Sequence, residues 1–185
     1  MQRSYKTGRA GTGWIEDMDT AKETPATPAA DTPADAPADA LSDSEAPRPF
    51  TTKIAVLLRE DLEAWQRLNV TAFLVSGIGS GFPEVIGAPY ADADGTAYLP
   101  MFRQPVMVFE GGKEQLTASH ARAVARAADV SLAVFTADLF ATGNDEDNRA
   151  AVRAAGRDAL DLVGIAVYGP RNAVDKIVKG ARKHP

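Results

Sequence analysis

KIAVLLREDLEAWQRLNVTAFLVSG, residues 53–77, is the stretch that decides the fold this sequence predicts. Its first part, Ile54–Leu58, is a continuous apolar run, which is typical of a strand covered on both faces. Charged residues 59–61 end the run, and Asp61 is a candidate N-cap for a helix. From Leu62 onward apolar residues recur at helical spacing on more than one side. We therefore expect a largely buried helix after a buried strand.

Polar exceptions interrupt this apolar helix. Asn69 and Ser76 are seven residues apart, which is two helical turns, so they share a face. This face is a candidate wall for a polar site.

Length and composition limit the class of protein. The chain has 185 residues and no cysteine, which suits one domain of ordinary size in a reducing compartment such as the cytoplasm. No apolar run approaches the roughly 20 residues that cross a bilayer, so we expect no membrane association. The formal charge is -5, of which residues 49–185 carry only -1. A domain so close to neutral lacks the positive field of a general nucleic-acid binder, so nucleic acid is not expected as a main partner.

Two parts of the chain differ in composition. Residues 1–49 are rich in Ala, Pro and Asp and contain only one pair of large apolar residues, Trp14-Ile15. Such a segment buries too little surface to offset its ordering entropy, so we expect a disordered tail there, with a docking role for Trp14-Ile15 as the alternative. Residues 50–185 are expected to form a single α/β domain.

Beyond residue 77 the chain alternates between strand and helix patterns. Asp92-Ala93-Asp94-Gly95 is typical of a hairpin turn. The expected strands are residues 84–86, 105–110, 130–135 and 160–168, and the expected helices are residues 113–128, 144–155 and 171–181. This alternation favours a three-layer α/β sandwich with helices on both faces of a mixed, mostly parallel sheet.

Several motifs invite a chemical interpretation that their context does not support. The glycines of residues 76–81 close a helix rather than open one, which argues against a phosphate loop. The aspartates of residues 92–94 lack the later ligands of a calcium loop, so no metal and no cofactor is expected. His120 lies on the apolar side of its helix and is interpreted as a packing residue. Arg171 follows a Gly-Pro turn at a helix start and is a candidate anion-binding residue, with a plain turn as the alternative.

Two segments resemble a known family. Arg59-Glu60-Asp61-Leu62 and its strand resemble the opening of the archaeal and eukaryotic type of peptidyl-tRNA hydrolase, and residues 164–180, GIAVYGPRNAVDKIVKG, look like that family's closing strand, Gly-Pro turn and helix. Over residues 53–183 the chain is similar to small bacterial relatives grouped as domain-of-unknown-function family two thousand. The resemblance implies a peptidyl-tRNA hydrolase II-like fold with a cleft.

The motif that carries the hydrolase activity is not kept. Asn69 falls where that family has a lysine, and Ser76 falls where it has a histidine. Residues 136–139 read Thr-Ala-Asp-Leu instead of Asp-Ala-Gly. The resemblance therefore implies the fold and the place of the cleft more than the reaction.

We expect a small cleft for a polar small molecule or nucleotide fragment, without efficient peptidyl-tRNA hydrolysis. Asn69 would orient the ligand, and Asp61 or Asp138 would serve as base if there is chemistry. The alternatives are a homodimeric, non-enzymatic binding or assembly module and a divergent hydrolase. The candidate cleft residues are Arg59, Asp61, Asn69, Ser76, Thr136 and Asp138.

Overall fold

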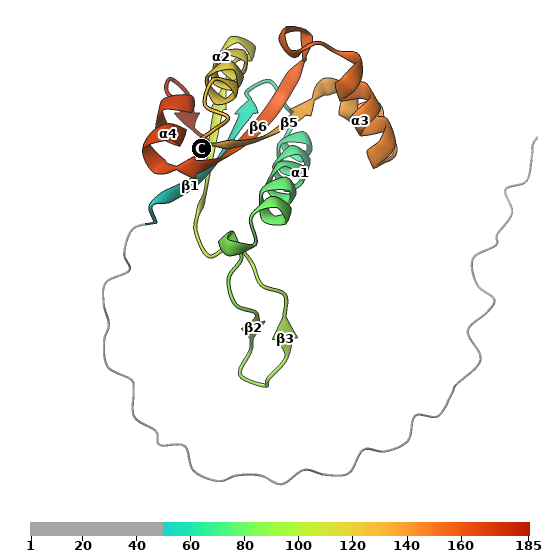
Figure 1. Cartoon of the computed structure of the whole chain (residues 1–185). Coiled ribbons are helices and arrows are strands. Elements are labelled where there is room, and N and C mark those ends of the chain that lie inside the picture. The colour runs from blue at the N-terminus through green and yellow to red at the C-terminus, as the bar shows by residue number, and fades with distance from the viewer. Residues whose placement is uncertain (1–49) are drawn as a thin grey trace, which may run out of the picture. The chain divides into compact units, whose positions relative to one another are not determined.

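The computed structural model describes residues 50–185, and the expectations for residues 1–49, including Trp14-Ile15, lie outside the described residues. The described chain folds around one five-stranded sheet, drawn in Figure 1. In chain order its helices and strands are β1 (Thr52–Arg59), α1 (Ala64–Gly81), η1 (Pro83–Val85), β2 (Tyr90–Ala91), β3 (Ala97–Tyr98), β4 (Val106–Gly111), α2 (Lys113–Val124), β5 (Ser131–Thr136), η2 (Ala137–Ala141), α3 (Asp145–Ala154), η3 (Arg157–Ala159), β6 (Leu162–Pro170), α4 (Arg171–Ile177) and β7 (Arg182–Lys183).

The apolar stretch Ile54–Leu58 forms the centre of the sheet, as its continuous pattern predicts. The strand order is β5-β6-β1-β4-β7, and β1 pairs with β4 in parallel and with β6 antiparallel. The β5–β6 and β4–β7 pairs are also antiparallel, so the prediction of a mostly parallel sheet is wrong. The reason lies in α3, which has no buried residue and does not carry the chain back along the length of the sheet. Strand β6 therefore begins near the point where β5 ends and runs in the opposite direction.

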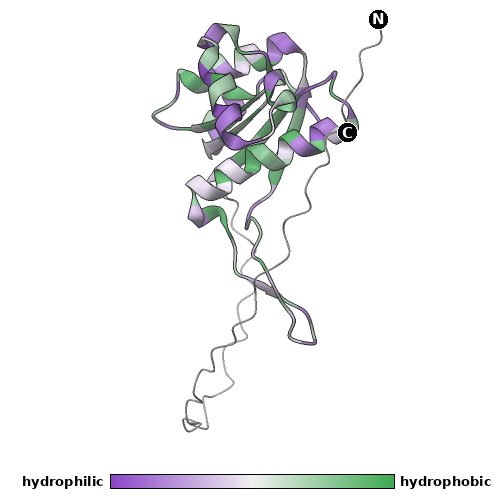
Figure 2. Cartoon of the chain, turned by 90° about the vertical axis from the view of Figure 1, so that its right-hand side faces the viewer, coloured by the Kyte–Doolittle hydropathy of each residue, from purple (hydrophilic) through white to green (hydrophobic). Residues whose placement is uncertain are grey.

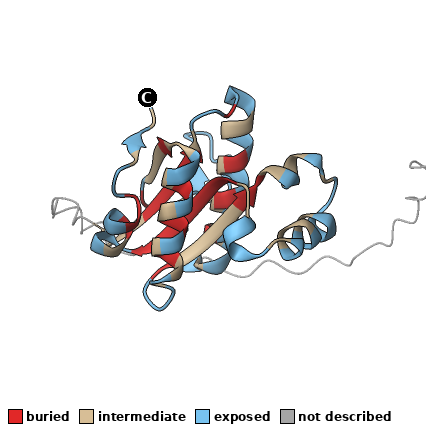
Figure 3. Ribbon diagram, turned by 90° about the horizontal axis from the view of Figure 1, so that it is seen from above, coloured by how far each residue is buried: buried red, intermediate tan, exposed pale blue. Residues whose placement is uncertain are grey.

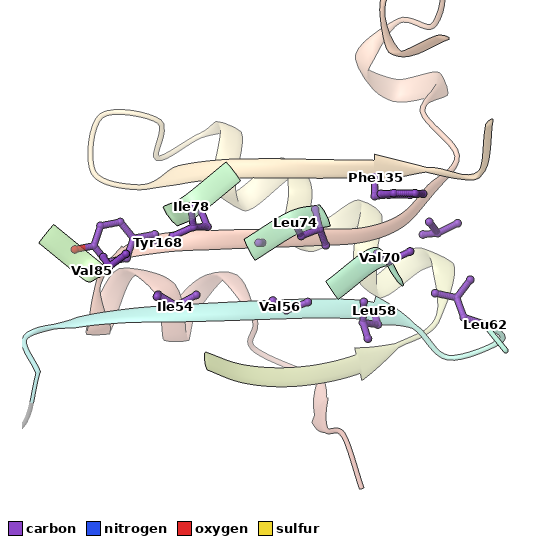
Figure 4. Close-up of a cluster of buried hydrophobic side chains, with 12 residues drawn as sticks. Ile54, Val56, Leu58, Leu62, Val70, Leu74, Ile78, Val85, Phe135 and Tyr168 are labelled. Atoms are coloured by element: carbon purple, nitrogen blue, oxygen red, sulfur yellow. The ribbon is translucent and has the colours of Figure 1, made fainter. Parts of the chain in front are cut away.

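Helices cover both faces of the sheet, as predicted. On one face, Val70, Leu74 and Ile78 of α1 pack against β1 and β6, and Figure 4 shows these side chains above Ile54 and Val56. On the opposite face, α2 and α4 bury further apolar side chains around Ala55, Leu57 and Val167 of the sheet. Figure 3 shows the buried strands between the more exposed outer surfaces of the helices.

Helix α1 is less buried than its composition suggests. Only Val70, Leu74 and Ile78 are buried, whereas Leu68 is 74% exposed, Trp65 56% and Phe73 53%. The expectation of a largely buried helix is therefore wrong. One sheet face can cover one stripe of a helix, and within the described chain no second layer covers the other apolar stripes.

Other boundaries also differ from the sequence prediction. Helix α1 begins after Glu63, whose backbone N–H donates to Gln66 Oε1 at 2.9 Å, so Glu63 and not Asp61 is the N-cap. The expected strand at residues 84–86 is the single turn η1, with a bridge between Ile86 and Phe102. The last long strand begins at Leu162, two residues later than expected.

The predicted hairpin is confirmed, and it extends away from the sheet in Figures 1 and 2. Asp92 Oδ1 accepts from the backbone N–H groups of Asp94 and Thr96, and Gly95 has φ +84°. The left-handed conformation explains why the turn carries glycine at that position. No helix among residues 50–185 has both the length and the apolar character of a membrane span.

Candidate functional site

A groove runs beside helix α1 along the stripe that contains the predicted pair Asn69 and Ser76. Two cavities of about 430 Å³ each make up this groove, one lined by Asn69 and the other by Ser76. They share Phe73 and Phe135 in their walls. We call the two cavities together the α1–α3 groove, because helix α1 forms one wall and the η2–α3 segment forms the other.

Aromatic rings dominate the part of the groove around Asn69. Trp65 and Phe140 meet edge to face with ring centroids 5.7 Å apart, and Phe73 meets Phe135 at 5.7 Å. Phe135 in turn lies 5.2 Å from Phe140. Helix α1 supplies Trp65 and Phe73 on either side of Asn69, at a spacing of four residues, so all three lie on one stripe. The rings of Trp65 and Phe73 remain more than half exposed, which leaves their surfaces open to a ligand.

Polar groups complete the rim of the groove. Among the hydrogen bonds of residues 50–185, none involves the side chain of Asn69, so its amide is open to a ligand or to water. Asn148 and Thr142 face the same cavity and hydrogen-bond to each other. Ser76 Oγ donates to the carbonyl of Phe73 at 2.7 Å, which is a bond within its own helix.

Arg59 and Asp61 belong to an ion-pair network outside the groove lining. Arg59 donates to Asp61 at 2.7 Å and to Asp161 at 2.9 Å, and Lys113 lies 2.8 Å from Asp161. The Lys113 hydrogen bond, with a smaller contribution from Arg59, lowers the pKa of Asp161 below its ordinary value, so this carboxylate is ionised at neutral pH. The carboxylates of Asp61 and Asp161 thus neutralise the positive charge of Arg59, so Arg59 has little capacity to bind a further anion.

Thr136 and Asp138 do not line the groove either. Thr136 ends β5, is buried, and its Oγ1 has no hydrogen-bond partner among the described residues. Asp138 is exposed on η2. The structure thus brings Asn69 and Ser76 together along one groove and leaves the other four candidates around it.

Two further predicted residues lie elsewhere. Arg171 lies at the start of α4, where its guanidinium donates to the Phe50 carbonyl at 3.3–3.4 Å. His120 is buried in α2, as its position on the apolar side predicts, and burial lowers its pKa below the ordinary value. Among residues 50–185, no three or more side chains of His, Cys, Asp and Glu gather in a way that could hold a metal ion.

The sequence analysis missed the aromatic walls of the groove. Trp65 and Phe73 look like core residues, because large apolar side chains at helical spacing normally pack inward. Their spacing of four residues from Asn69 was the available signal. The opposite wall, formed by the η2–α3 segment, gave no such signal. This segment follows β5 in the chain, so its proximity to α1 depends on the position of β5 at the sheet edge.

Comparison with known proteins gives a family and a structural relative. A solved structure of the protein of unknown function Atu0240 from Agrobacterium tumefaciens strain C58 shares 43% sequence identity with this chain. The match covers 74% of this chain and 100% of that one, with a TM-score of 0.71. No curated protein matches the sequence. The model of the family described as "Protein of unknown function (DUF2000)" matches residues 52–185, which confirms the suspected family. The chain therefore belongs to the DUF2000 family.

Proposed function

We propose that the α1–α3 groove binds a small molecule that combines a planar apolar ring with a polar edge, such as a nucleobase or a nucleotide fragment. The observation that carries this proposal is the open amide of Asn69 between the exposed rings of Trp65 and Phe73. A side-chain amide offers one acceptor and two donors, so it can pair with the polar edge of a ring.

The shape and chemistry of the groove support a ligand of this kind. Each cavity, at about 430 Å³, lies within the roughly 300–1,000 Å³ of small-molecule sites. Aromatic side chains give a flat ring an apolar surface, and stacking on them is worth about 1–3 kcal/mol per base in proteins that bind single strands. Polar and charged side chains also line the groove, among them Asn144, Asp145 and Arg149, and they offer hydrogen-bond partners to the polar edge of such a ring.

We also propose that the fold is of the peptidyl-tRNA hydrolase II type but that it has lost efficient hydrolysis of peptidyl-tRNA. Asn69 carries no charge at any pH, and the Ser76 hydroxyl donates to its own helix. Arg59 is compensated by Asp61 and Asp161, so it does not offer a free charge to a developing oxyanion. The absence of cysteine supports the proposal of a cytoplasmic location.

A binding experiment tests the groove. The full-length protein is titrated calorimetrically with a panel of nucleobases, nucleosides and nucleotides, and Asn69→Ala is expected to weaken the best ligand about tenfold, as the loss of a specific hydrogen bond does. Asn172→Ala removes an exposed amide on α4, away from the groove, and serves as the matched control. Equal affinity of Asn69→Ala and the unchanged protein would contradict the proposal.

A homodimer is the second candidate, and one surface favours it. A further cavity of about 750 Å³ lies between α1 and β4, with Leu68, Ala72, Val106 and Val108 in its walls. A second copy of the chain that covers Leu68 would remove a 74% exposed leucine from water. Sedimentation velocity with Leu68→Glu tests this: a dimer that dissociates in the variant supports it, and a monomeric unchanged protein contradicts it.

A further inference from the structure

A fourth cavity, far from the α1–α3 groove along the sheet, combines positive charge with an apolar floor. It has a volume of about 490 Å³ and lies where β1 and β4 begin and where the α4–β7 connection passes. The α1–α3 groove, by contrast, adjoins Phe135 at the end of β5, which runs in the same direction as β1. The two sites thus lie at opposite ends of the strands.

The charges around this cavity do not balance. Four cationic side chains line it, Lys53, Arg171, Lys179 and Lys183, against one carboxylate, Asp175. Asp175 pairs with Lys53, and Arg171 donates only to the uncharged carbonyl of Phe50. Among the ion pairs of residues 50–185, none involves Lys179 or Lys183. The cavity therefore carries an excess of three positive charges, which favours an anion.

A buried amide in the same lining is a second and independent sign of a ligand. Gln104 is only 6% exposed, and its Oε1 accepts from Thr52 Oγ1 at 3.0 Å. Its Nε2 has no acceptor within the described part of the chain. An unsatisfied buried donor destabilises the fold, so such groups normally meet a water molecule or a ligand. A ligand that satisfies Gln104 must bring a hydrogen-bond acceptor.

The floor of the cavity selects an organic anion over a bare inorganic one. Met107 and Phe109 of β4 line it, together with Val178 beyond α4. An apolar body would cover these side chains, while its charged end met the lysines and Gln104. Burial of that body removes apolar surface from water, which stabilises the complex.

We propose that this cavity binds a small organic anion, a carboxylate or a phosphate monoester on a hydrophobic body, with Lys179 and Lys183 meeting the charge and Gln104 donating from the buried side. The site is independent of the proposed function of the α1–α3 groove.

Calorimetric titration of the full-length protein with three phenyl compounds of similar shape and with inorganic phosphate tests the ligand chemistry. Phenyl phosphate and phenylacetate are expected to bind, and the neutral phenylacetamide is expected to bind at least about tenfold more weakly, because it cannot make charge-assisted hydrogen bonds. If phenyl phosphate binds more tightly than phenylacetate, the ligand class is a phosphate ester. If phenylacetate binds more tightly, the ligand class is a carboxylate. No binding of either anion, or inorganic phosphate binding as tightly as phenyl phosphate, would overturn the proposal.

Two lysines on neighbouring turns provide a matched pair of variants. Lys179→Glu reverses a charge in the cavity lining and is expected to weaken the anionic probes about tenfold or more. Lys176→Glu makes the same change at an exposed position of α4 outside the lining and is expected to leave affinity nearly unchanged. Equal losses of affinity in both variants would indicate that the probes respond only to the overall electrostatic field of the protein. That result would overturn the proposed site. Gln104→Met, which keeps the size but removes the donor, is expected to weaken binding as well, and the lysine pair decides the matter if that variant does not fold.

Discussion

At the scale of single residues, Glu110 is the only buried carboxylate among residues 50–185. It is buried at the end of β4, and it accepts from Arg182 at 2.7 Å and from Arg67 at 2.8 Å. The Arg182 hydrogen bond, supported by Arg67, lowers the pKa of Glu110 below its ordinary value of 4.5. A lowered pKa in the folded state means that this carboxylate stabilises the fold above pH 4.5 and that the contribution is lost as pH falls through the folded-state pKa.

The substitution Arg182→Gln should therefore destabilise the protein at pH 7 by more than at low pH. Removing Arg182 takes away the main cause of the lowered pKa, so the variant should lose its deficit as Glu110 becomes protonated in both proteins. Urea denaturation of both proteins from pH 7 down to pH 3 measures the difference in unfolding free energy. A difference that stays constant over this range would contradict the assignment.

Gly164 in β6 is a second residue whose identity has a direct physical cause. A Cβ at this position would lie 2.5 Å from Val70 Cγ1 and 3.0 Å from Leu74 Cδ1, so helix α1 can approach the sheet only over a glycine. Gly164→Ala is expected to cost about 1–3 kcal/mol through overpacking. Gly156→Ala, where nothing lies within 4 Å, is the control and should change the unfolding free energy far less. Equal stability of the two variants would contradict this packing argument.

At the scale of the element, helix α1 presents three different stripes. The first, with Leu74, packs on the sheet, the second, with Asn69, lines the α1–α3 groove, and the third, with Leu68, borders the cavity next to β4. Leu74→Ala should destabilise the protein by about 2–5 kcal/mol, whereas Leu68→Ala should change stability by no more than about 0.5 kcal/mol. Chemical denaturation of both variants measures the two values. Similar losses would show that the third stripe is covered in solution.

The strands were predictable from sequence, and their directions were not. Ile54–Leu58 and the run before Thr136 are continuous apolar segments of strand length, so their identity as strands depends on local sequence alone. Direction depends on whether the intervening helix crosses the sheet, and α3 does not. The two-residue strand β7 is too short for any periodicity to reveal. The exposed stripes of α1 were missed because local sequence does not tell which side of an apolar helix meets the sheet.

The candidate site was likewise predictable only in the part that depends on local sequence. Asn69 and Ser76 share a helical face by spacing alone, and both line the groove. Arg59 and Asp61 are close in sequence, but Asp161, the second carboxylate that accepts from Arg59, lies 102 residues away from it, so the ion-pair network could not be predicted from either segment.

At the scale of the whole molecule, we expect the purified protein to hydrolyse peptidyl-tRNA far below the rates of about 1–10³ s⁻¹ that are ordinary for enzymes. General acid–base assistance is typically worth about 10²–10⁴-fold, and neither Asn69 nor Ser76 supplies it. Release of the peptide from labelled peptidyl-tRNA measures the rate, with an active hydrolase of that family as the positive control. Turnover at ordinary rates would contradict both the alignment of Asn69 and the proposed loss of activity.

The position of β1 in the middle of the sheet has a consequence for synthesis of the protein on the ribosome. Its antiparallel neighbour β6 supplies partners that lie at least 106 residues later in the chain, as the pairing of Leu58 with Gly164 shows. At about 5–20 residues per second, the continuous apolar run of β1 emerges roughly 5–20 s before this antiparallel partner exists. The nascent chain must therefore keep Ile54–Leu58 from associating with other chains throughout that interval, which makes it a natural client for chaperones that bind exposed apolar segments.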